Sequence, residues 1–125
     1  MTGTDVIDSR AREILDDLVS GPEERWGDAV LIAWLNDGAR LIADQRPESL
    51  LTGPYTYAAW ADITALGDTI PISDRYRAAL SEYVAGMALH QEAQDERDLA
   101  RANSLLRSYS AKAGLDASLV IPTGR

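Results

Sequence analysis

The side chains that could carry acid–base or metal chemistry are few in this sequence of 125 residues. His90 is the single histidine, and there is no cysteine. A zinc site usually needs several His or Cys ligands, and a serine-based triad needs partners around its histidine, so His90 alone predicts neither. The missing cysteines exclude disulfides and a thiolate nucleophile. We therefore expect no catalytic residue, no metal site and no cofactor, and a protein that is not an enzyme.

Four carboxylates lie close together in the sequence, at Glu92, Asp95, Glu96 and Asp98. Carboxylate oxygens bind calcium or magnesium, so a small enzyme with a carboxylate site over residues 92–98 is one hypothesis. It predicts divalent-metal binding, which calorimetry can measure. The cluster lacks the glycine turn and the ligand spacing of an EF-hand loop, however. A solvated turn between two helices is the interpretation that we favour.

The charge of the chain argues against a protein that grips nucleic acid. Twenty acidic and twelve basic residues give a formal net charge of −8, whereas phosphate binding needs clustered lysine and arginine. The acidic surplus either serves solubility or lines a surface that DNA passes without sticking. The longest apolar stretch, residues 29–35, is too short to span a membrane, and the N-terminus shows no apolar run of a signal peptide.

The elements that would position these side chains are mainly helices within one domain. Apolar residues recur with helical spacing over residues 4–18, 28–45 and 73–94, and again up to a glycine C-cap at Gly114. The expected N-caps are Thr4, Asp28, and Ser73 or Asp74.

The predicted fold is mainly α, a four-helix bundle with a β-hairpin or extended arm inserted between the second and third helices. We expect a helical domain over residues 1–115, with the arm at about residues 46–73, and a C-terminal docking tail over residues 116–125. The predicted core consists of Trp26, Leu31, Trp34, Leu35, Leu41, Leu80, Tyr83, Val84, Met87, Leu105 and Tyr109.

The second helix carries more apolar residues than one core face needs. Its inward stripe would be filled by Leu31, Trp34 and Leu35, while Val30, Ile32 and Ala33 occupy the other side of its first two turns. A helix that is apolar all round must be covered all round. Two explanations remain open: a central helix of the core, or a helix packed between neighbouring subunits of an assembly.

The arm and the tail supply the candidate contact residues. Proline and glycine break the helical pattern over residues 46–73, and two short strands are expected at about residues 55–59 and 69–72. An isolated hairpin is marginal in water, so the arm should lean on its own helices or on a neighbour. Leu119, Val120 and Ile121 either dock onto a partner or fold back onto the helices. The candidates for contacts with another subunit or with a partner protein are Tyr55, Tyr57, Trp60, Leu119, Val120 and Ile121.

A family resemblance is carried by the order and spacing of several short motifs. The motifs are Arg25-Trp26-Gly27-Asp28, Leu31, Trp34-Leu35-Asn36-Asp37-Gly38, Arg46-Pro47, Ile70-Pro71-Ile72, Asp74, Tyr76, Ala79-Leu80, the helix 83–91 and the helix 102–114. Together they cover roughly residues 5–115, and in them the chain resembles the head-to-tail adaptor (connector) proteins of tailed bacteriophages.

The resemblance implies a structural virion protein of the neck. Such adaptors form a homo-oligomeric ring, usually of twelve copies, which docks under the portal protein, extends the DNA channel and provides the attachment platform for tail or nozzle proteins. Genomic DNA would pass through the lumen without specific binding, and no membrane is involved. Assembly would take place in the host cytoplasm. The chain departs from the pattern in residues 49–68 and 116–125, which leaves the partners of these segments open.

A different class of function fits the same composition. The chain could be a small soluble helical module that binds one partner or regulates it. Rings and monomers differ grossly in native mass and in negative-stain images, so these measurements separate the two readings. An adaptor that stays monomeric until a portal templates it would need the portal to be present.

Overall fold

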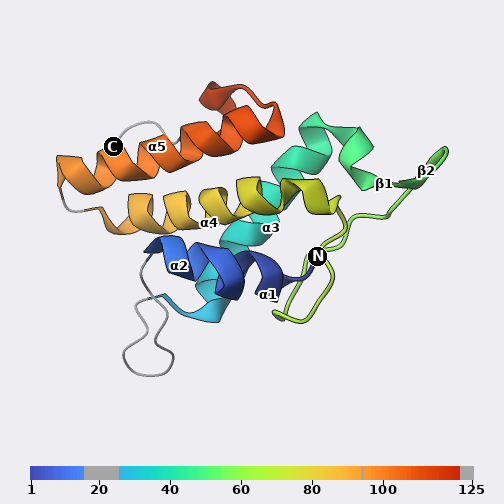
Figure 1. The fold of residues 1–125 in the computed structure, drawn as a ribbon, viewed down its shortest axis with the longest axis horizontal. Coiled ribbons are helices and arrows are strands. Elements are labelled where there is room, and N and C mark those ends of the chain that lie inside the picture. Colours follow the sequence, from blue (N-terminus) through green and yellow to red (C-terminus); the bar gives the residue numbers. More distant parts are fainter. Residues whose placement is uncertain (16–25, 94, 122–125) are drawn as a thin grey trace.

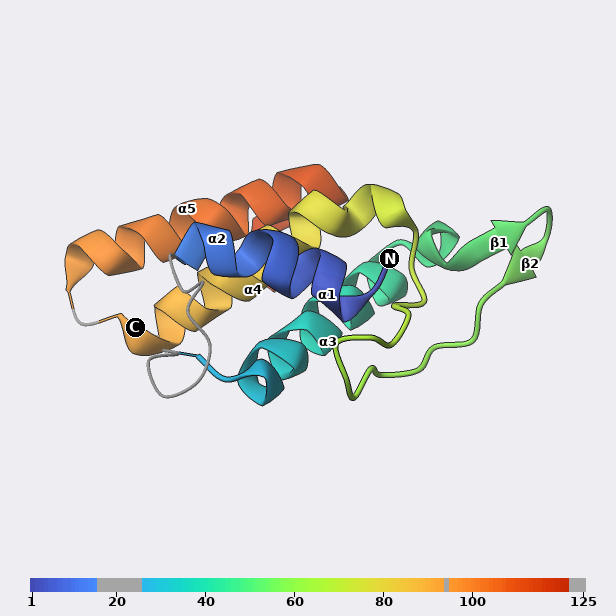
Figure 2. The same ribbon diagram turned by 60° about the horizontal axis from the view of Figure 1, so that its bottom comes forward.

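A computed structural model describes residues 1–15, 26–93 and 95–121, which form a mainly helical fold with one small antiparallel hairpin (Figure 1). Four helical segments make the body, and the hairpin projects from one end of it in both ribbon views (Figure 2). No helix among the described residues is long and apolar enough to cross a membrane.

The first helical segment begins earlier than its pattern predicts. Thr2, rather than Thr4, is the N-cap: its hydroxyl accepts a hydrogen bond from the Asp5 N–H, and the Asp5 carboxylate accepts one from the Thr2 N–H. This capping box needs an acidic or amide residue three positions on, which Thr2 has in Asp5 and Thr4 lacks. Residues 16–18 of the predicted helix lie outside the described residues. The segment consists of α1 (Gly3–Val6), a π-helical turn (Ile7–Ala11) and α2 (Arg12–Leu15).

The second helix, α3 (Asp28–Gln45), ends where the sequence predicts, because Arg46 precedes a proline and leaves the helical conformation. Its N-cap is Gly27, so the prediction of Asp28 was wrong by one position. Asp28 is instead the first helical residue, where its carboxylate accepts a hydrogen bond of 2.7 Å from Arg12. Gly27 has the extended backbone of an N-cap, with a φ of −72° and a ψ of 156°, so the helical conformation begins at Asp28.

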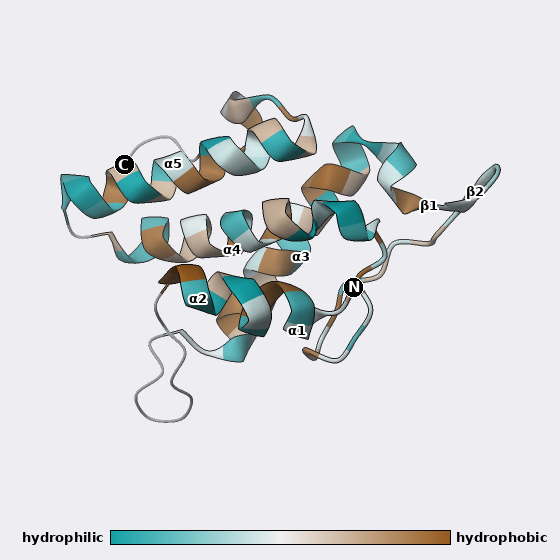
Figure 3. Cartoon of the chain, in the orientation of Figure 1, coloured by the Kyte–Doolittle hydropathy of each residue, from teal (hydrophilic) through white to brown (hydrophobic). Residues whose placement is uncertain are grey.

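The last two long helices lie close to their predicted positions. Ser73 caps a 3₁₀ turn (Asp74–Tyr76) that leads into α4 (Arg77–Glu92). Asp95 caps α5 (Glu96–Ala113), which ends at Gly114 with the left-handed φ of 72° that favours glycine. The predicted end of the third helix, Gln94, lies outside the described residues. In Figure 3, α5 alternates between hydrophilic and hydrophobic colours, as expected of an amphipathic surface helix.

The hairpin pairs other segments than the two strands predicted at about residues 55–59 and 69–72. After a 3₁₀ turn (Pro47–Leu50), β1 (Leu51–Gly53) pairs with β2 (Thr56–Tyr57). Pro54 and Tyr55 form the turn between them, and Tyr55 has a φ of 61°. The strand expected at residues 69–72 is reduced to one bridge between Thr69 and Thr2, because Ile70 and Ile72 enter the core instead.

The helix that is buried on nearly all sides is α4, not α3. It packs against the N-terminal segment, α3 and α5, and its small residues, including Ala79, Ser81, Ala85 and Gly86, allow this close approach. Helix α3 buries Leu31, Ile32, Leu35 and Ile42 and leaves Val30 43% exposed. Of the three extra apolar residues of α3, Ile32 enters the core, whereas Val30 and Ala33 stay exposed.

A tyrosine pair joins three helices at the centre of the fold. The rings of Tyr83 and Tyr109 meet edge to face at 4.7 Å, and the Tyr109 hydroxyl donates to the Gly38 carbonyl at 2.7 Å. Burial raises the pKa of Tyr83 to about 12 and that of Tyr109 further, so both phenols stay protonated at neutral pH. Gly38 leaves room for Tyr83, since a Cβ at this position would lie 2.5 Å from its ring.

The predicted core residues fall into two groups. Trp26, Leu31, Leu35, Leu80, Tyr83, Val84 and Tyr109 are buried. Trp34, Leu41, Met87 and Leu105 are partly buried and pack against the core from its edge.

Candidate functional site

The residues with potential for chemistry are used in the fold. His90 is buried on α4. The Asp95 carboxylate accepts the N–H of Asp98 at 2.9 Å and so caps α5, while Glu96 and Asp98 lie in the first turn of that helix, where negative charge is favourable. No group of three His, Cys, Asp or Glu side chains in residues 1–15, 26–93 and 95–121 is placed to hold a metal ion.

An apolar hollow of about 380 Å³ lies on the outer face of α3. Gln91 of α4 lines it together with five α3 residues, Ala29, Val30, Ala33, Trp34 and Asp37. These α3 positions recur at helical spacing and form one outward stripe. Ile32, expected on this side, is buried in the core instead, because it falls on the opposite face. This outer stripe is the apolar face of α3 that a single copy of the chain leaves exposed to solvent.

A second exposed apolar surface lies at the projecting hairpin. Tyr55 is 98% exposed at the turn, and Tyr57 on β2 is 59% exposed. Leu51 on β1 is also exposed. The β1–β2 hairpin that carries these residues projects away from the body (Figures 1 and 2).

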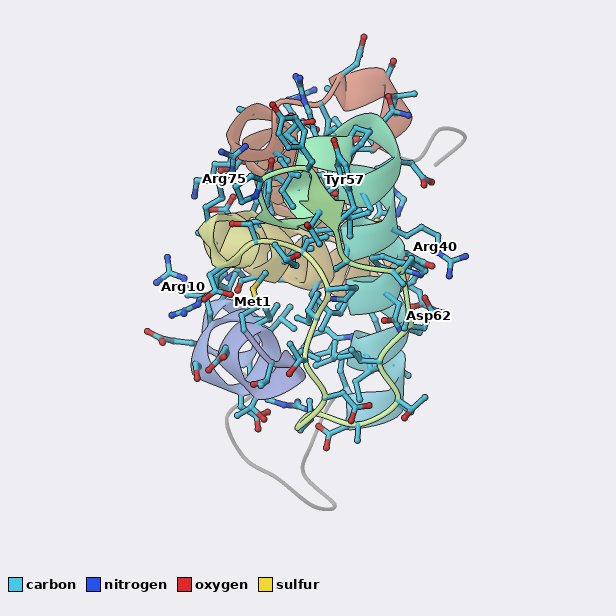
Figure 4. The ribbon with its side chains drawn as sticks, turned by 90° about the vertical axis from the view of Figure 1, so that its right-hand side faces the viewer. Met1, Arg10, Arg40, Tyr57, Asp62 and Arg75 are labelled. Atoms are coloured by element: carbon cyan, nitrogen blue, oxygen red, sulfur yellow. The ribbon has the colours of Figure 1, made fainter. Side chains whose placement is uncertain are left out.

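The third aromatic candidate of the arm, Trp60, contacts its own chain. Its indole N–H donates to the Asp62 carboxylate at 2.9 Å, and the Arg40 guanidinium lies 5.4 Å from the ring centroid. Arg40 also forms an ion pair of 2.7 Å with Asp62 (Figure 4). Trp60 is partly buried. Trp60 therefore attaches the arm to α3. Its position in the sequence, outside any helical stripe, did not predict this contact.

The part of the arm after the hairpin is held by hydrogen bonds between its backbone and two polar side chains. The Asn36 amide makes a reciprocal pair of hydrogen bonds with the backbone of Ile63, both at 2.9 Å. The Asp68 carboxylate accepts the N–H groups of Thr64 and Ala65, and these bonds lower the pKa of Asp68. The loop is thus fixed on the same helix, α3, that carries the apolar hollow.

The C-terminal candidates separate into three environments. Val120 is buried against the core, so for this residue folding back is correct and docking is wrong. Ile121 is partly buried, and Leu119 is 52% exposed. The physical reason is the turn after Gly114, where the Leu115 N–H donates to the Ser110 carbonyl and reverses the chain.

A basic hollow of about 320 Å³ lies where the end of α3, the start of α4 and the end of α5 meet. Arg46, Arg75 and Lys112 line it together with Glu48. Arg46 donates to the Gly114 carbonyl at 2.5 and 3.1 Å, and Lys112 forms an ion pair with Glu82. Sequence reasoning missed this cluster because its members are far apart in the chain, and only the fold brings them together.

A buried arginine was also missed. Arg12 donates to the Trp26 carbonyl at 2.9 Å and to Asp28 at 2.7 Å, and it approaches Asp8 at 3.4 Å. It joins the N-terminal segment to the start of α3.

Comparison of the chain with protein-family models, curated proteins and solved structures finds no match.

Proposed function

We propose that this protein is a structural subunit of a homo-oligomeric ring, the head-to-tail adaptor of a tailed bacteriophage. The observation that carries the proposal is the presence of two separate exposed apolar surfaces, the outer stripe of α3 and the hairpin tip. A closed ring needs heterologous contacts, in which each copy presents two different faces to its two neighbours. The sequence resemblance to adaptor proteins supports the same assignment.

This arrangement gives the helical body and the arm of the subunit different roles. The N-terminal segment, α3, α4 and α5 would act together as a four-helix bundle, the rigid body of the subunit. The arm, with Tyr55 and Tyr57 at its tip, would reach a neighbouring copy, the portal or a tail protein. Aromatic side chains are common anchors of such interfaces. The acidic surplus of the chain would face the lumen and let DNA pass, because acidic walls repel phosphate.

Incubation of the protein with a purified portal ring, followed by electron microscopy, tests the proposal. We expect added density below the portal with the symmetry of the adaptor ring. The matched variants are Tyr55→Ser, which changes an exposed contact candidate, and Thr52→Ser, a conservative change on the neighbouring strand. If the wild-type protein leaves the portal bare while folding normally, the adaptor assignment is wrong.

The alternative is a small helical module that binds one partner. Such a module needs one binding surface. This chain exposes two apolar surfaces, one on α3 and one on the hairpin, and that difference favours the ring. If a polar substitution in the outer stripe of α3 leaves assembly on the portal unchanged, this result favours the module that binds one partner. Val30→Ser is the variant that measures this.

A further inference from the structure

Cations from three separate elements of this acidic chain converge at the basic hollow. Arg46 follows α3, Arg75 lies in the turn before α4, and Lys112 lies in the last turn of α5. Glu48 lines the hollow and Glu82 pairs with Lys112, so three positive groups meet two negative ones there. For a chain with a net charge of −8, this is a local reversal of sign.

The cations of the hollow retain donors for a ligand. A guanidinium has five N–H donors and an ammonium has three. Arg46 uses two of its nitrogens on the Gly114 carbonyl, which neutralises the negative end of α5. Arg75 donates to the Tyr76 hydroxyl at 2.7 Å and is otherwise exposed, and the Lys112 ammonium contacts Glu82. The hollow is therefore suited to a carboxylate-bearing segment.

The same chain presents carboxylates at the far end of the same helix. Asp95 and Glu96 are exposed at the turn before α5, and Asp98 is partly exposed. Helix α5 has 18 residues, so its two ends are about 27 Å apart. Both ribbon views place the start and the end of α5 at opposite ends of the α4–α5 pair (Figures 1 and 2). The acidic turn cannot reach the basic hollow of its own molecule.

We propose that the acidic turn at residues 95–98 of one copy docks into the basic hollow of the next copy. The contact joins two different surfaces of identical chains, so it is heterologous and repeats from copy to copy. This inference rests on the proposed ring and adds a polar contact to the apolar ones described above. The pairs are partly exposed, so salt screens them, and they set register and orientation more than affinity.

Zero-length cross-linking tests the contact directly. A carbodiimide couples carboxylates to primary amines, and Lys112 is the only lysine of the chain. Apart from the N-terminal amine, every amide cross-link must therefore involve Lys112. We expect covalent dimers, from concentrated protein or from portal-bound rings, in which the peptide containing Lys112 is joined to the one containing residues 95–98. Reaction with Glu82 of the same copy stays in the monomer band.

Charge reversal supplies the matched variants. Arg75→Glu and Glu96→Arg should each lower the yield of this dimer about fivefold, as expected for an exposed ion pair. Combining the two in one chain should restore it, because the complementarity is then reversed on both surfaces. Arg107→Glu is the control, since Arg107 is exposed on α5 and the net charge changes equally. Circular dichroism melts identify a variant that fails to fold, and Glu96→Gln then replaces Glu96→Arg.

The outcomes separate this contact from the ring itself. A ring whose cross-links join other peptides overturns the contact and leaves the adaptor function standing. Absence of covalent dimers both in concentrated solution and on the portal overturns the contact as well. Coupling of Lys112 to carboxylates of the portal would show that the hollow serves that partner, which also overturns docking by a second copy.

Discussion

The close approach of α3 and α4 at Gly38 should make Gly38→Ala strongly destabilising. The new Cβ would lie 2.5 Å from Cδ1 and 2.9 Å from Cγ of Tyr83, about 1 Å inside normal carbon contact. The ring cannot move away, because it is buried and packs on Tyr109 at 4.7 Å. Overpacking of this kind costs about 1–3 kcal/mol.

Two further terms set the net change in the free energy of unfolding. Alanine is favoured over glycine in a helix interior by about 1 kcal/mol, which opposes the overpacking. If α3 shifts outward to relieve the clash, the hydrogen bond from Tyr109 to the Gly38 carbonyl is weakened, at a cost of about 1 kcal/mol. With overpacking at the upper end of its range, the net destabilisation is about 2–3 kcal/mol.

Urea unfolding followed by circular dichroism measures this quantity. Gly67→Ala is the matched control, because a Cβ at residue 67 meets nothing within 4 Å, and its stability should be unchanged or slightly higher. Tyr83→Leu should remove much of the clash, so the double variant with Gly38→Ala should be less destabilised than the sum of the single ones. A Gly38→Ala protein as stable as the wild type would refute the packing described for this junction.

Three other measurements follow from the structure. Tyr109→Phe removes the donor to the Gly38 carbonyl without changing the ring, so the free energy of unfolding should fall by about 1 kcal/mol in urea titrations. Arg12→Ala should lower it by about 2–3 kcal/mol, since a buried carbonyl and two carboxylates lose their partner; a change below 0.5 kcal/mol, roughly that of a surface substitution, would contradict this role. The lowered pKa of Asp68 means that its contribution to the loop is present above the usual carboxyl pKa of 3.8 and is lost as pH falls through the lower folded value. The protection factors of the Thr64 and Ala65 amides, which correct the exchange rates for their intrinsic pH dependence, should therefore fall on acidification in the wild type and be independent of this titration in Asp68→Asn.

Local sequence signals predicted the helices because each boundary depends on a few adjacent residues. The proline after Arg46, the serine at position 73 and the glycine at position 114 act within one turn of the chain. The first N-cap was misplaced because two threonines were available, and the decisive difference was Asp5, three residues after Thr2.

Properties that depend on distant segments were not predictable in the same way. The alternation of Ile70 and Ile72 resembles a strand, yet both positions are buried between helices. Helix α4 became central because its small residues accept neighbours on every side, whereas the larger apolar residues of α3 gave the stronger sequence signal. The basic hollow forms only where three helix ends meet in the fold, which brings together Arg46, Arg75 and Lys112. No spacing rule in the sequence could have identified it.

The attachment of the arm to α3 has a consequence for any assembly that uses both apolar surfaces. Asn36 and Arg40 fix the arm to the same helix that carries Val30 and Ala33 on its outer face. The orientation of the hairpin relative to the outer stripe of α3 is therefore set by this one helix. In a ring, the angle between the two apolar contacts of each copy would therefore be set within α3, whereas the polar contact through the ends of α5 would depend on the rest of the body.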